Sequence, residues 1–256
     1  MATAPSTTVL KAFRVLDLLR DRRQVGVAEC ARLLGLARPS AHRLLVSLTA
    51  AGALERTESG QYQLALRMFE LGAQAPFRRS LYDQAHAPLQ ELVSATHLPA
   101  DLGVRDQTEV LHLLKISHDA ERAHTRAGGR NRLYATAMGK MLLADAPVRV
   151  IEQVLTGQLH PYTPYTVTAP AQLAAQVEMV RRSGFAYEME ERQIGLVGLA
   201  TAIHDRDGRV LAAISVSGRS ERYRPRIETL RQPLRRAADA IERNIRSLPR
   251  SVVART

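Results

Sequence analysis

Apolar residues recur at helical spacing in three runs within the first 50 positions of the chain. The first run lies at residues 7–20 and the second at residues 27–34. The third run places Ala41, Leu44 and Leu48 at i, i+3 and i+7, so that they share one face of a helix. The pattern therefore predicts three short helices, each with one buried side.

A glycine and a proline mark the turn between the second and third helices. Gly35 directly follows the second run, where glycine commonly takes the left-handed conformation that ends a helix. Pro39 falls in the first turn of the next helix, where its missing N–H leaves no hydrogen bond unmade. Alternating segments at 54–56 and 62–64 then predict a β-hairpin. This order indicates a winged helix-turn-helix, a module that places its second motif helix in the DNA major groove.

Long cations and short hydroxyls lie on the side of the third helix that its apolar stripe leaves open. Such side chains reach phosphates and base edges. The candidate DNA contacts are Arg38, Ser40, His42, Arg43 and Ser47 on the helix and Arg56 on the hairpin. The alternative is a solvated face without a partner, but the helix pair and the hairpin come in the order that DNA binding requires.

The rest of the chain alternates short strands with helices. Strands are predicted at 98–105, 110–116, 185–189, 197–204 and 210–217, helices at 79–97, 137–144, 148–155, 169–183 and 225–247, and a Gly- and Arg-rich loop at 126–132. Pro88 predicts a kink in the first of these helices, and Pro233 predicts a kink or a split in the last. The turn sequence DRDG joins two strands as a hairpin, which requires antiparallel pairing. We expect an α+β domain whose sheet is covered by helices on one side.

These patterns divide the chain into three parts. A winged helix-turn-helix domain occupies residues 1–65, a linker helix and joint occupy 66–78, and a second domain occupies 79–250. Pro76 restricts the residue before it to extended conformations, so the joint is expected to be a semi-rigid elbow.

Charge and cysteine content narrow the class of protein. The net charge is +11, and residues 1–79 carry 12 basic and 6 acidic side chains, so the positive charge is densest there and favours encounter with a polyanion. Cys30 is the single cysteine, which excludes an internal disulfide and a multi-cysteine zinc site. With no membrane-length apolar run and no secretory core, a cytoplasmic protein without a membrane partner is expected.

Two other classes of function were weighed against regulated DNA binding. A small-molecule hydrolase with a DNA-binding appendage needs an activated nucleophile, but the residue two before Ser217 is Ser215, so the G-x-S-x-G motif is absent. Metalloprotease, P-loop and dinucleotide motifs are also absent, so no enzyme, cofactor or metal is expected. An architectural or RNA-binding protein is disfavoured because four Phe, seven Tyr and no Trp supply few stacking platforms.

Several long motifs resemble the IclR family of bacterial transcriptional regulators over nearly the whole chain. They are VAECARLLGLARPSAHRLLVSLTAAGALER with GQYQL, LRMFELG, LYATAMGKMLLA, and RRSGFAYEMEERQIGLVGLATAIHDRDGRVLAAISVSG. The resemblance implies a GAF-like α+β sensor domain behind the winged helix-turn-helix, and a dimer or dimer of dimers. It also implies effector-binding residues at Ala137, Met138, Glu188, Gly198, Ser215 and Ser217.

The residues themselves agree with a ligand site at these positions. Ser215 and Ser217 lie two apart on a strand and face one side, unless that side is simply solvated. A helix that begins near Ala137 offers free backbone amides to an anion. A small organic acid or aromatic metabolite is therefore the expected effector. The neighbouring Glu190 and Glu191 are expected to be solvated.

This chain departs from the family pattern in the expected ligand site. Many members of the family that this chain resembles carry cysteine at the position of Gly198. Many also carry small or polar residues at the position of Met138 and Asp at the position of Glu188. The family's proline usually falls where Ala37 stands, which puts the contact of Arg38 in question. We hypothesise a repressor of a metabolic or catabolic operon that binds a pseudopalindromic double-stranded operator, with an activator as the alternative.

Overall fold

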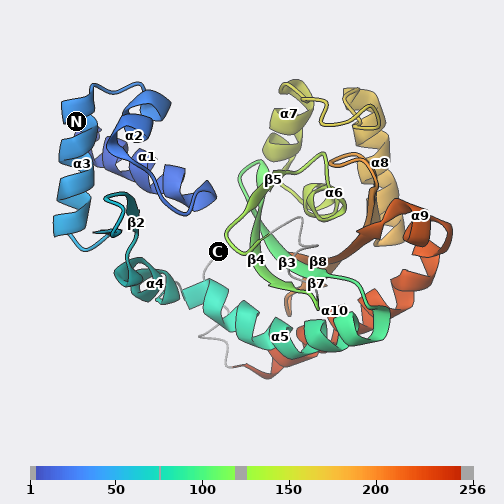
Figure 1. The fold of residues 1–256 in the computed structure, drawn as a ribbon. Helices are drawn as coiled ribbons and strands as arrows, with labels where there is room; N and C mark the ends of the chain where they lie inside the picture. The colour runs from blue at the N-terminus through green and yellow to red at the C-terminus, as the bar shows by residue number, and fades with distance from the viewer. Residues whose placement is uncertain (1–3, 75, 119–125, 249–256) are drawn as a thin grey trace. The chain divides into compact units, whose positions relative to one another are not determined.

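The computed structural model describes residues 4–74, 76–118 and 126–248, so residues 119–125 and the last two residues of the predicted 79–250 domain lie outside the described part. Two compact units divide the chain, residues 1–76 and residues 77–256 (Figure 1). In the described ranges, no helix is both long and apolar enough to cross a bilayer.

The N-terminal unit is the predicted three-helix module with a hairpin. Its elements are α1 (Thr7–Asp21), α2 (Val27–Leu34), α3 (Arg38–Ala50), β1 (Leu54–Arg56) and β2 (Tyr62–Leu64). Gly35 ends α2 with φ 64°, a left-handed conformation that costs glycine no steric strain. Buried Val15, Cys30, Leu45 and Tyr62 belong to one core that unites the helices with the hairpin.

Two consecutive helices lead out of this module. The helix α4 (Leu66–Ala73) has no buried residue, and α5 (Pro76–Thr96) begins at the predicted joint. The helix predicted at 79–97 therefore starts earlier, at Pro76, and ends at Thr96 with Pro88 inside it.

A six-stranded antiparallel sheet forms the centre of the C-terminal unit, in the order β5-β4-β3-β8-β7-β6. The strands are β3 (Ala100–Asp106), β4 (Glu109–Ile116), β5 (Arg130–Arg132), β6 (Ala186–Met189), β7 (Leu196–His204) and β8 (Val210–Arg219). The predicted loop at 126–132 thus ends in a short edge strand, because Arg130–Arg132 pair with β4. The α+β fold class is confirmed.

Helices cover both faces of this sheet, so the expectation of one covered face is wrong. On one face lie α6 (Ala137–Ala144), α7 (Val148–Thr156) and α8 (Pro170–Ser183), and on the other lie α5 and α10 (Arg231–Ser247) (Figure 1). The physical reason is visible in β7, where eight consecutive residues are buried. A strand that is buried on both faces has an uninterrupted apolar run, and its neighbours must cover both sides.

Short helical segments connect β8 to α10. They are α9 (Ser220–Tyr223) and the 3₁₀ helix η2 (Arg224–Leu230). The predicted C-terminal helix is therefore split before Arg231, and Pro233 lies in the first turn of α10, where a proline is tolerated.

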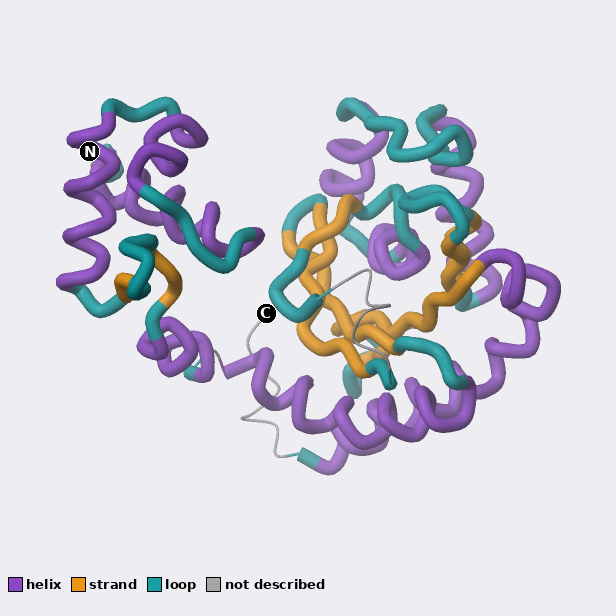
Figure 2. Tube along the Cα trace, in the orientation of Figure 1, coloured by secondary structure: helices purple, strands orange, loops and turns teal. Residues whose placement is uncertain are grey.

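The helix α6 packs closely inside the curve of the sheet (Figure 2). All eight of its residues are buried. Thr136 caps it, since its Oγ1 accepts a hydrogen bond from the Gly139 N–H at 3.0 Å. A Cβ on Gly139 would overlap the backbone carbonyl of Leu133, so the glycine allows this helix to approach the preceding segment. The result is a helix N-terminus held firmly above the sheet.

Candidate functional site

The exposed face of α3 carries most of the predicted DNA contacts. Four of these side chains are exposed: Arg38, His42, Arg43 and Ser47. Ser40 is half-buried at the edge of the face. Val46 lies between the polar residues and is 46% exposed, although sequence reasoning, which looked only for polar contacts, missed it. An apolar side chain in that position suits a thymine methyl group.

The hairpin presents Arg56 beside its turn. The Arg56 Nε donates to the Gly60 carbonyl oxygen at 3.3 Å, which steers this exposed side chain along the turn. The turn is closed by Thr57, whose Oγ1 accepts from the Gln61 N–H at 3.1 Å. The predicted wing is therefore an ordered hairpin with one cation at its tip.

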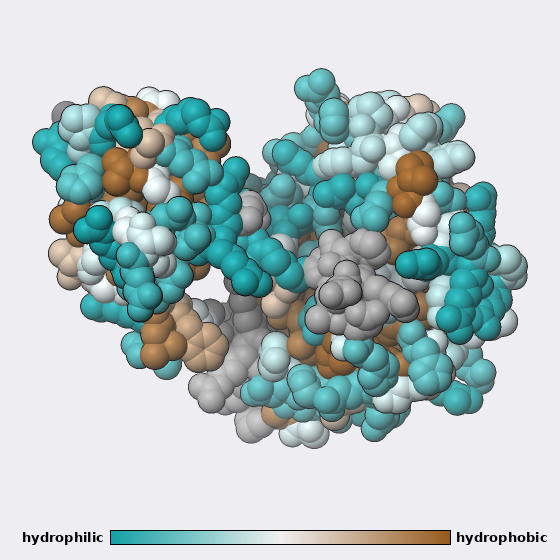
Figure 3. All heavy atoms as spheres, viewed as in Figure 1, coloured by the Kyte–Doolittle hydropathy of each residue, from teal (hydrophilic) through white to brown (hydrophobic). Residues whose placement is uncertain are grey.

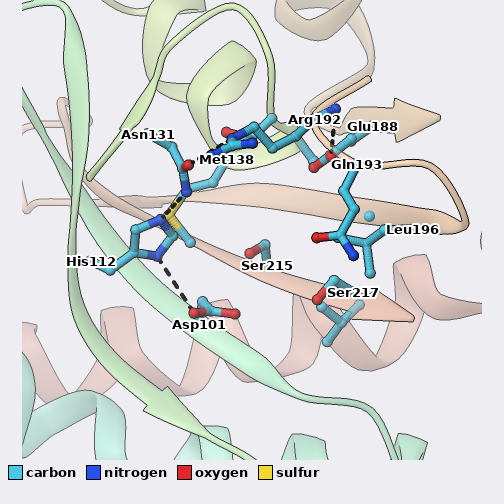
Figure 4. Close-up of a pocket in the computed structure, with 14 residues that line it drawn as sticks. Asp101, His112, Asn131, Met138, Glu188, Arg192, Gln193, Leu196, Ser215 and Ser217 are labelled. Atoms are coloured by element: carbon cyan, nitrogen blue, oxygen red, sulfur yellow. Dashed lines mark hydrogen bonds and ion pairs between the residues drawn. The ribbon is translucent and has the colours of Figure 1, made fainter. Parts of the chain in front are cut away.

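A cavity of about 90 Å³ lies between α6 and the sheet, and all six predicted effector residues line it (Figure 4). These six are Ala137, Met138, Glu188, Gly198, Ser215 and Ser217. The solvated alternative for the two serines does not hold, since Ser215 is 9% exposed and Ser217 is half-buried. Their role in binding an effector stays a prediction, but the structure brings them to one place.

The pairing register of three strands explains why these residues lie together. Glu188 on β6 lies opposite Gly198 on β7, and Gly198 lies opposite Ser217 on β8. Adjacent strands direct paired residues to the same face, so the three positions form a row beneath α6. A Cβ on Gly198 would meet the Ala137 Cβ at 3.7 Å, which places the helix N-terminus directly over the row.

Several cavity residues were missed by sequence reasoning. They are Asp101, His112, Asn131, Thr136, Arg192, Gln193, Leu196 and Val216. Asp101 and His112 are only 3% and 4% exposed. The sequence did carry a signal for both, because each is a polar side chain in an otherwise largely apolar strand. Such groups are seldom buried without a partner or a role.

Burial raises the pKa of the Glu188 carboxyl to about 7. Backbone N–H groups of Arg192 and Ala137 and the charge of Lys140 oppose this shift, while the charge of Glu191 adds to it. Burial therefore outweighs the stabilising contacts. An amide at the start of α6, which we expected to be offered to a ligand, is thus partly satisfied by the protein's own carboxyl.

The expectation of solvated acids after β6 is wrong for Glu191. Its side chain is 5% exposed and forms an ion pair with Lys140 of α6, with Nζ to Oε1 at 2.6 Å. The backbone oxygen of Glu191 also accepts from the Thr166 hydroxyl at 2.6 Å. These contacts tie the acidic segment to α6 and to the loop between α7 and α8, and so hold Glu188 at the cavity.

The cavity combines polar side chains at its edge with polar groups in its interior. Within the residues the structure describes, no group of three or more His, Cys, Asp or Glu side chains could hold a metal ion. Exposed Arg192 and Gln193 form its outer edge, whereas the carboxyl of Glu188 and the serine hydroxyls lie inside. Polar groups convergent on a small buried volume suit a compact, polar ligand.

We expect Glu188→Gln to raise the free energy of unfolding at pH 8. In the folded protein the carboxyl ionises near pH 7, whereas its ordinary pKa is 4.5, so the wild type loses stability as the pH rises through this window. The variant lacks this loss, which amounts to roughly 3 kcal/mol at pH 8 and disappears at pH 4. Urea unfolding at both pH values measures it.

The exposed Glu152→Gln on α7 serves as the control and should leave the pH dependence unchanged. Equal stability of wild type and Glu188→Gln at pH 8 would contradict the burial of an ionisable carboxyl at this site.

Comparisons with known proteins agree in both units. Residues 8–58 match the IclR helix-turn-helix domain, and residues 75–243 match the bacterial transcriptional regulator IclR C-terminal domain. The HTH-type transcriptional regulator KdgR of Escherichia coli (strain K12) is 32% identical over 214 residues, which cover 82% of this chain and 81% of that protein. The glycerol operon regulatory protein of Streptomyces griseus is 34% identical over 218 residues, with 84% and 85% covered.

Solved structures show the same likeness. An IclR homolog from Microbacterium hydrocarbonoxydans, complexed with 4-hydroxybenzoate, matches with a TM-score of 0.86 at 28% identity and covers 94% of this chain and 100% of that chain. IclR of Thermotoga maritima matches with a TM-score of 0.73 at 28% identity, with 94% and 99% covered. The hydrolase alternative is therefore wrong: the chain belongs to the IclR family of bacterial transcriptional regulators, and it is a DNA-binding regulator, not an enzyme.

Proposed function

We propose that this chain is a ligand-responsive repressor of a metabolic or catabolic operon, acting in the bacterial cytoplasm. The observation that carries the proposal is the cavity beneath α6, because it joins six predicted effector residues in a unit separate from the DNA-binding module. An activator of the same class is the alternative. The two differ in whether the ligand releases the operator or strengthens binding to it.

A small organic acid or an aromatic metabolite is the effector that this cavity supports best. Serine hydroxyls, the Gln193 amide and the Arg192 guanidinium offer hydrogen-bond donors to a carboxylate. A protonated Glu188 donates as well, whereas its ionised form repels an anion. The likeness to a 4-hydroxybenzoate complex is consistent with this class.

A second copy of the chain would cover apolar surface on the N-terminal unit. On α1, Val9, Leu10 and Phe13 are 53%, 54% and 62% exposed, and on α4, Leu66 and Phe69 are 71% and 74% exposed. Apolar side chains are visible on the surface of this unit (Figure 3). Large apolar side chains that stay exposed in this number are candidates for an interaction surface. A dimer formed there presents two copies of α3, which a pseudopalindromic operator requires.

The effector can act on DNA binding only by favouring one arrangement of the chain. A ligand shifts an equilibrium by its difference in affinity for the two states. The covalent path between the cavity and the DNA-binding module is the pair of helices α4 and α5, which meet at the Pro76 joint. We propose that ligand occupancy changes the conformations open to this joint.

Arg43→Ala is expected to weaken operator binding about tenfold or more at fixed salt, because an exposed cation on the recognition face is lost. A mobility-shift titration with DNA from the gene's own upstream region measures the affinity. Repeating it over a range of salt separates two roles: a phosphate contact lowers the salt slope by about one, and a base contact relaxes sequence preference. Arg149→Ala, an exposed arginine of α7, is the matched control, and wild-type affinity of Arg43→Ala contradicts the interface.

Phe69→Glu should dissociate the dimer without unfolding the chain, because a charge replaces an exposed apolar side chain that a partner would bury. Sedimentation equilibrium gives the oligomeric state, and circular dichroism confirms the fold. Val148→Glu changes a side chain that is 69% exposed on α7 and is the matched control. A dimer that survives Phe69→Glu at the wild-type dissociation constant places the interface elsewhere.

A thermal-shift screen of small carboxylates and aromatic acids should yield ligands that raise the melting temperature at pH 6 more than at pH 8. The reason is that the Glu188 carboxyl has a pKa of about 7. At pH 6 it is mostly neutral and does not repel a ligand carboxylate, whereas at pH 8 it is mostly ionised and does. Ser215→Ala should abolish most of the shift, whereas Ser247→Ala should preserve it. Shifts that are insensitive to Ser215→Ala argue for a different binding site.

A further inference from the structure

A second, larger hollow lies directly beyond one end of the cavity beneath α6. Gln193, Leu196 and Ser217, which lie together at that end, line both spaces (Figure 4). The second hollow, which we call the outer pocket, has a volume of about 490 Å³, against about 90 Å³ for the inner cavity. Because the two spaces share these walls, a ligand held in the inner cavity has room to extend outward.

The strand β8 leads from one space to the other. Ser215, Ser217 and Arg219 are two residues apart on it, so their side chains point to the same face. Ser215 lines the inner cavity, Ser217 lines both spaces, and Arg219 lines the outer pocket. Two residues of a strand span about 7 Å. The row therefore places a cation one such step beyond the hydroxyls that we propose for the effector.

Cations exceed anions in the lining of the outer pocket. Arg219 and Arg222 are exposed there, and neither forms an ion pair with a carboxylate of the residues that the structure describes. Glu221 is the single acid among the described lining residues. Guanidinium groups bind carboxylates and phosphates through paired N–H donors. The two arginines are thus available to an anionic group of a ligand.

Close packing positions Arg222 at this pocket. A Cβ on Gly218 would overlap the Tyr223 ring and the Leu98 side chain, so the glycine lets the buried ring lie against β8. The guanidinium of Arg222 lies over this ring, 5.4 Å from its centre. Such a cation–π contact restricts the side chain, while its N–H donors stay available to an anion.

The wall between the two polar ends is apolar. Leu196 is 8% exposed and lines both spaces, and Leu98 and Pro99 line the outer pocket. A methylene chain or an aromatic ring suits this stretch, because contact there removes apolar surface from water. A ligand with an anionic group at each end and an apolar middle therefore matches the chemistry of both spaces.

We propose that the effector carries a second anionic group, a carboxylate or a phosphate, which Arg219 and Arg222 bind in the outer pocket, so that this regulator selects a small diacid over the matching monoacid. The inference rests on the proposed function, in which the inner cavity binds the first carboxylate. The two arginines determine specificity, because they contact only the second group. A monoacid gains none of their charge-assisted hydrogen bonds.

The test compares matched pairs of acids by isothermal titration calorimetry on the full-length chain. The pairs are hexanoate with adipate, heptanoate with pimelate, 4-methylbenzoate with terephthalate, and glycerate with 3-phosphoglycerate. In at least one pair the wild type should bind the diacid about tenfold or more tightly. Arg219→Gln and Arg222→Gln should each lower this ratio and together bring it close to one, with the affinity for the monoacid unchanged. Both side chains are exposed, so the variants should fold.

Two further variants complete the test. Arg209→Gln changes an exposed arginine just before the other end of β8, and as the matched control it should keep the ratio. Ser215→Ala should weaken both members of a pair, because both place a carboxylate in the inner cavity. A diacid whose affinity is insensitive to Ser215→Ala binds in the outer pocket alone and overturns the inference.

Equal affinities within every pair, or a ratio that survives the Arg219→Gln and Arg222→Gln double variant, also overturn the inference, while the effector site stands. If no acid of the panel binds, the proposed effector class itself is contradicted, and the inference falls with it.

Discussion

The close approach of α6 to the sheet is the constraint on which the cavity beneath this helix depends. Gly139 permits backbone contact with Leu133, and a Cβ on Gly103 of β3 would meet the side chain of Met138, so glycines above and below make room for the helix. Every residue of α6 is buried, and its first turn forms one wall of the cavity. Because protein interiors are close-packed, a shift of this helix must change the cavity and the sheet contacts together.

Buried charge connects this helix to the acidic segment after β6. Burial removes water from Lys140 and Glu191, which costs free energy. Their ion pair and the hydrogen bond from Lys140 to the Gln176 amide oxygen offset only part of this desolvation cost. Such a pair contributes orientation more than stability, and here it holds the segment that carries Glu188 and Arg192. The Glu188 carboxyl at the cavity is thus positioned by the ion pair between Lys140 and Glu191, three residues further along the chain.

Local sequence patterns predicted the helices and strands of the N-terminal unit closely, and they predicted the layers and the cavity of the C-terminal unit less completely. The helix-turn-helix follows from Gly35, Pro39 and short-range periodicity, and the hairpin bounds agree with those predicted. Helices on both faces of the sheet were missed because apolar runs alone do not reveal what covers each side. His112 and Asp101 meet at the cavity through strand pairing between β3 and β4, a long-range relation that no short motif encodes.

At Gly198 the volume of the cavity can be changed without a change in the stability of the fold. A Cβ at this position would sit 3.5 Å from the Val216 carbonyl oxygen and 3.7 Å from Ala137 and Glu188, which is ordinary contact. The backbone there needs no glycine conformation, since Gly198 is absent from the residues with positive φ. A single methyl group can therefore be added to the floor of the cavity without disturbing its walls. For a designer of biosensors, Gly198 is therefore a position where the volume of the cavity can be changed one methyl group at a time without a cost to folding.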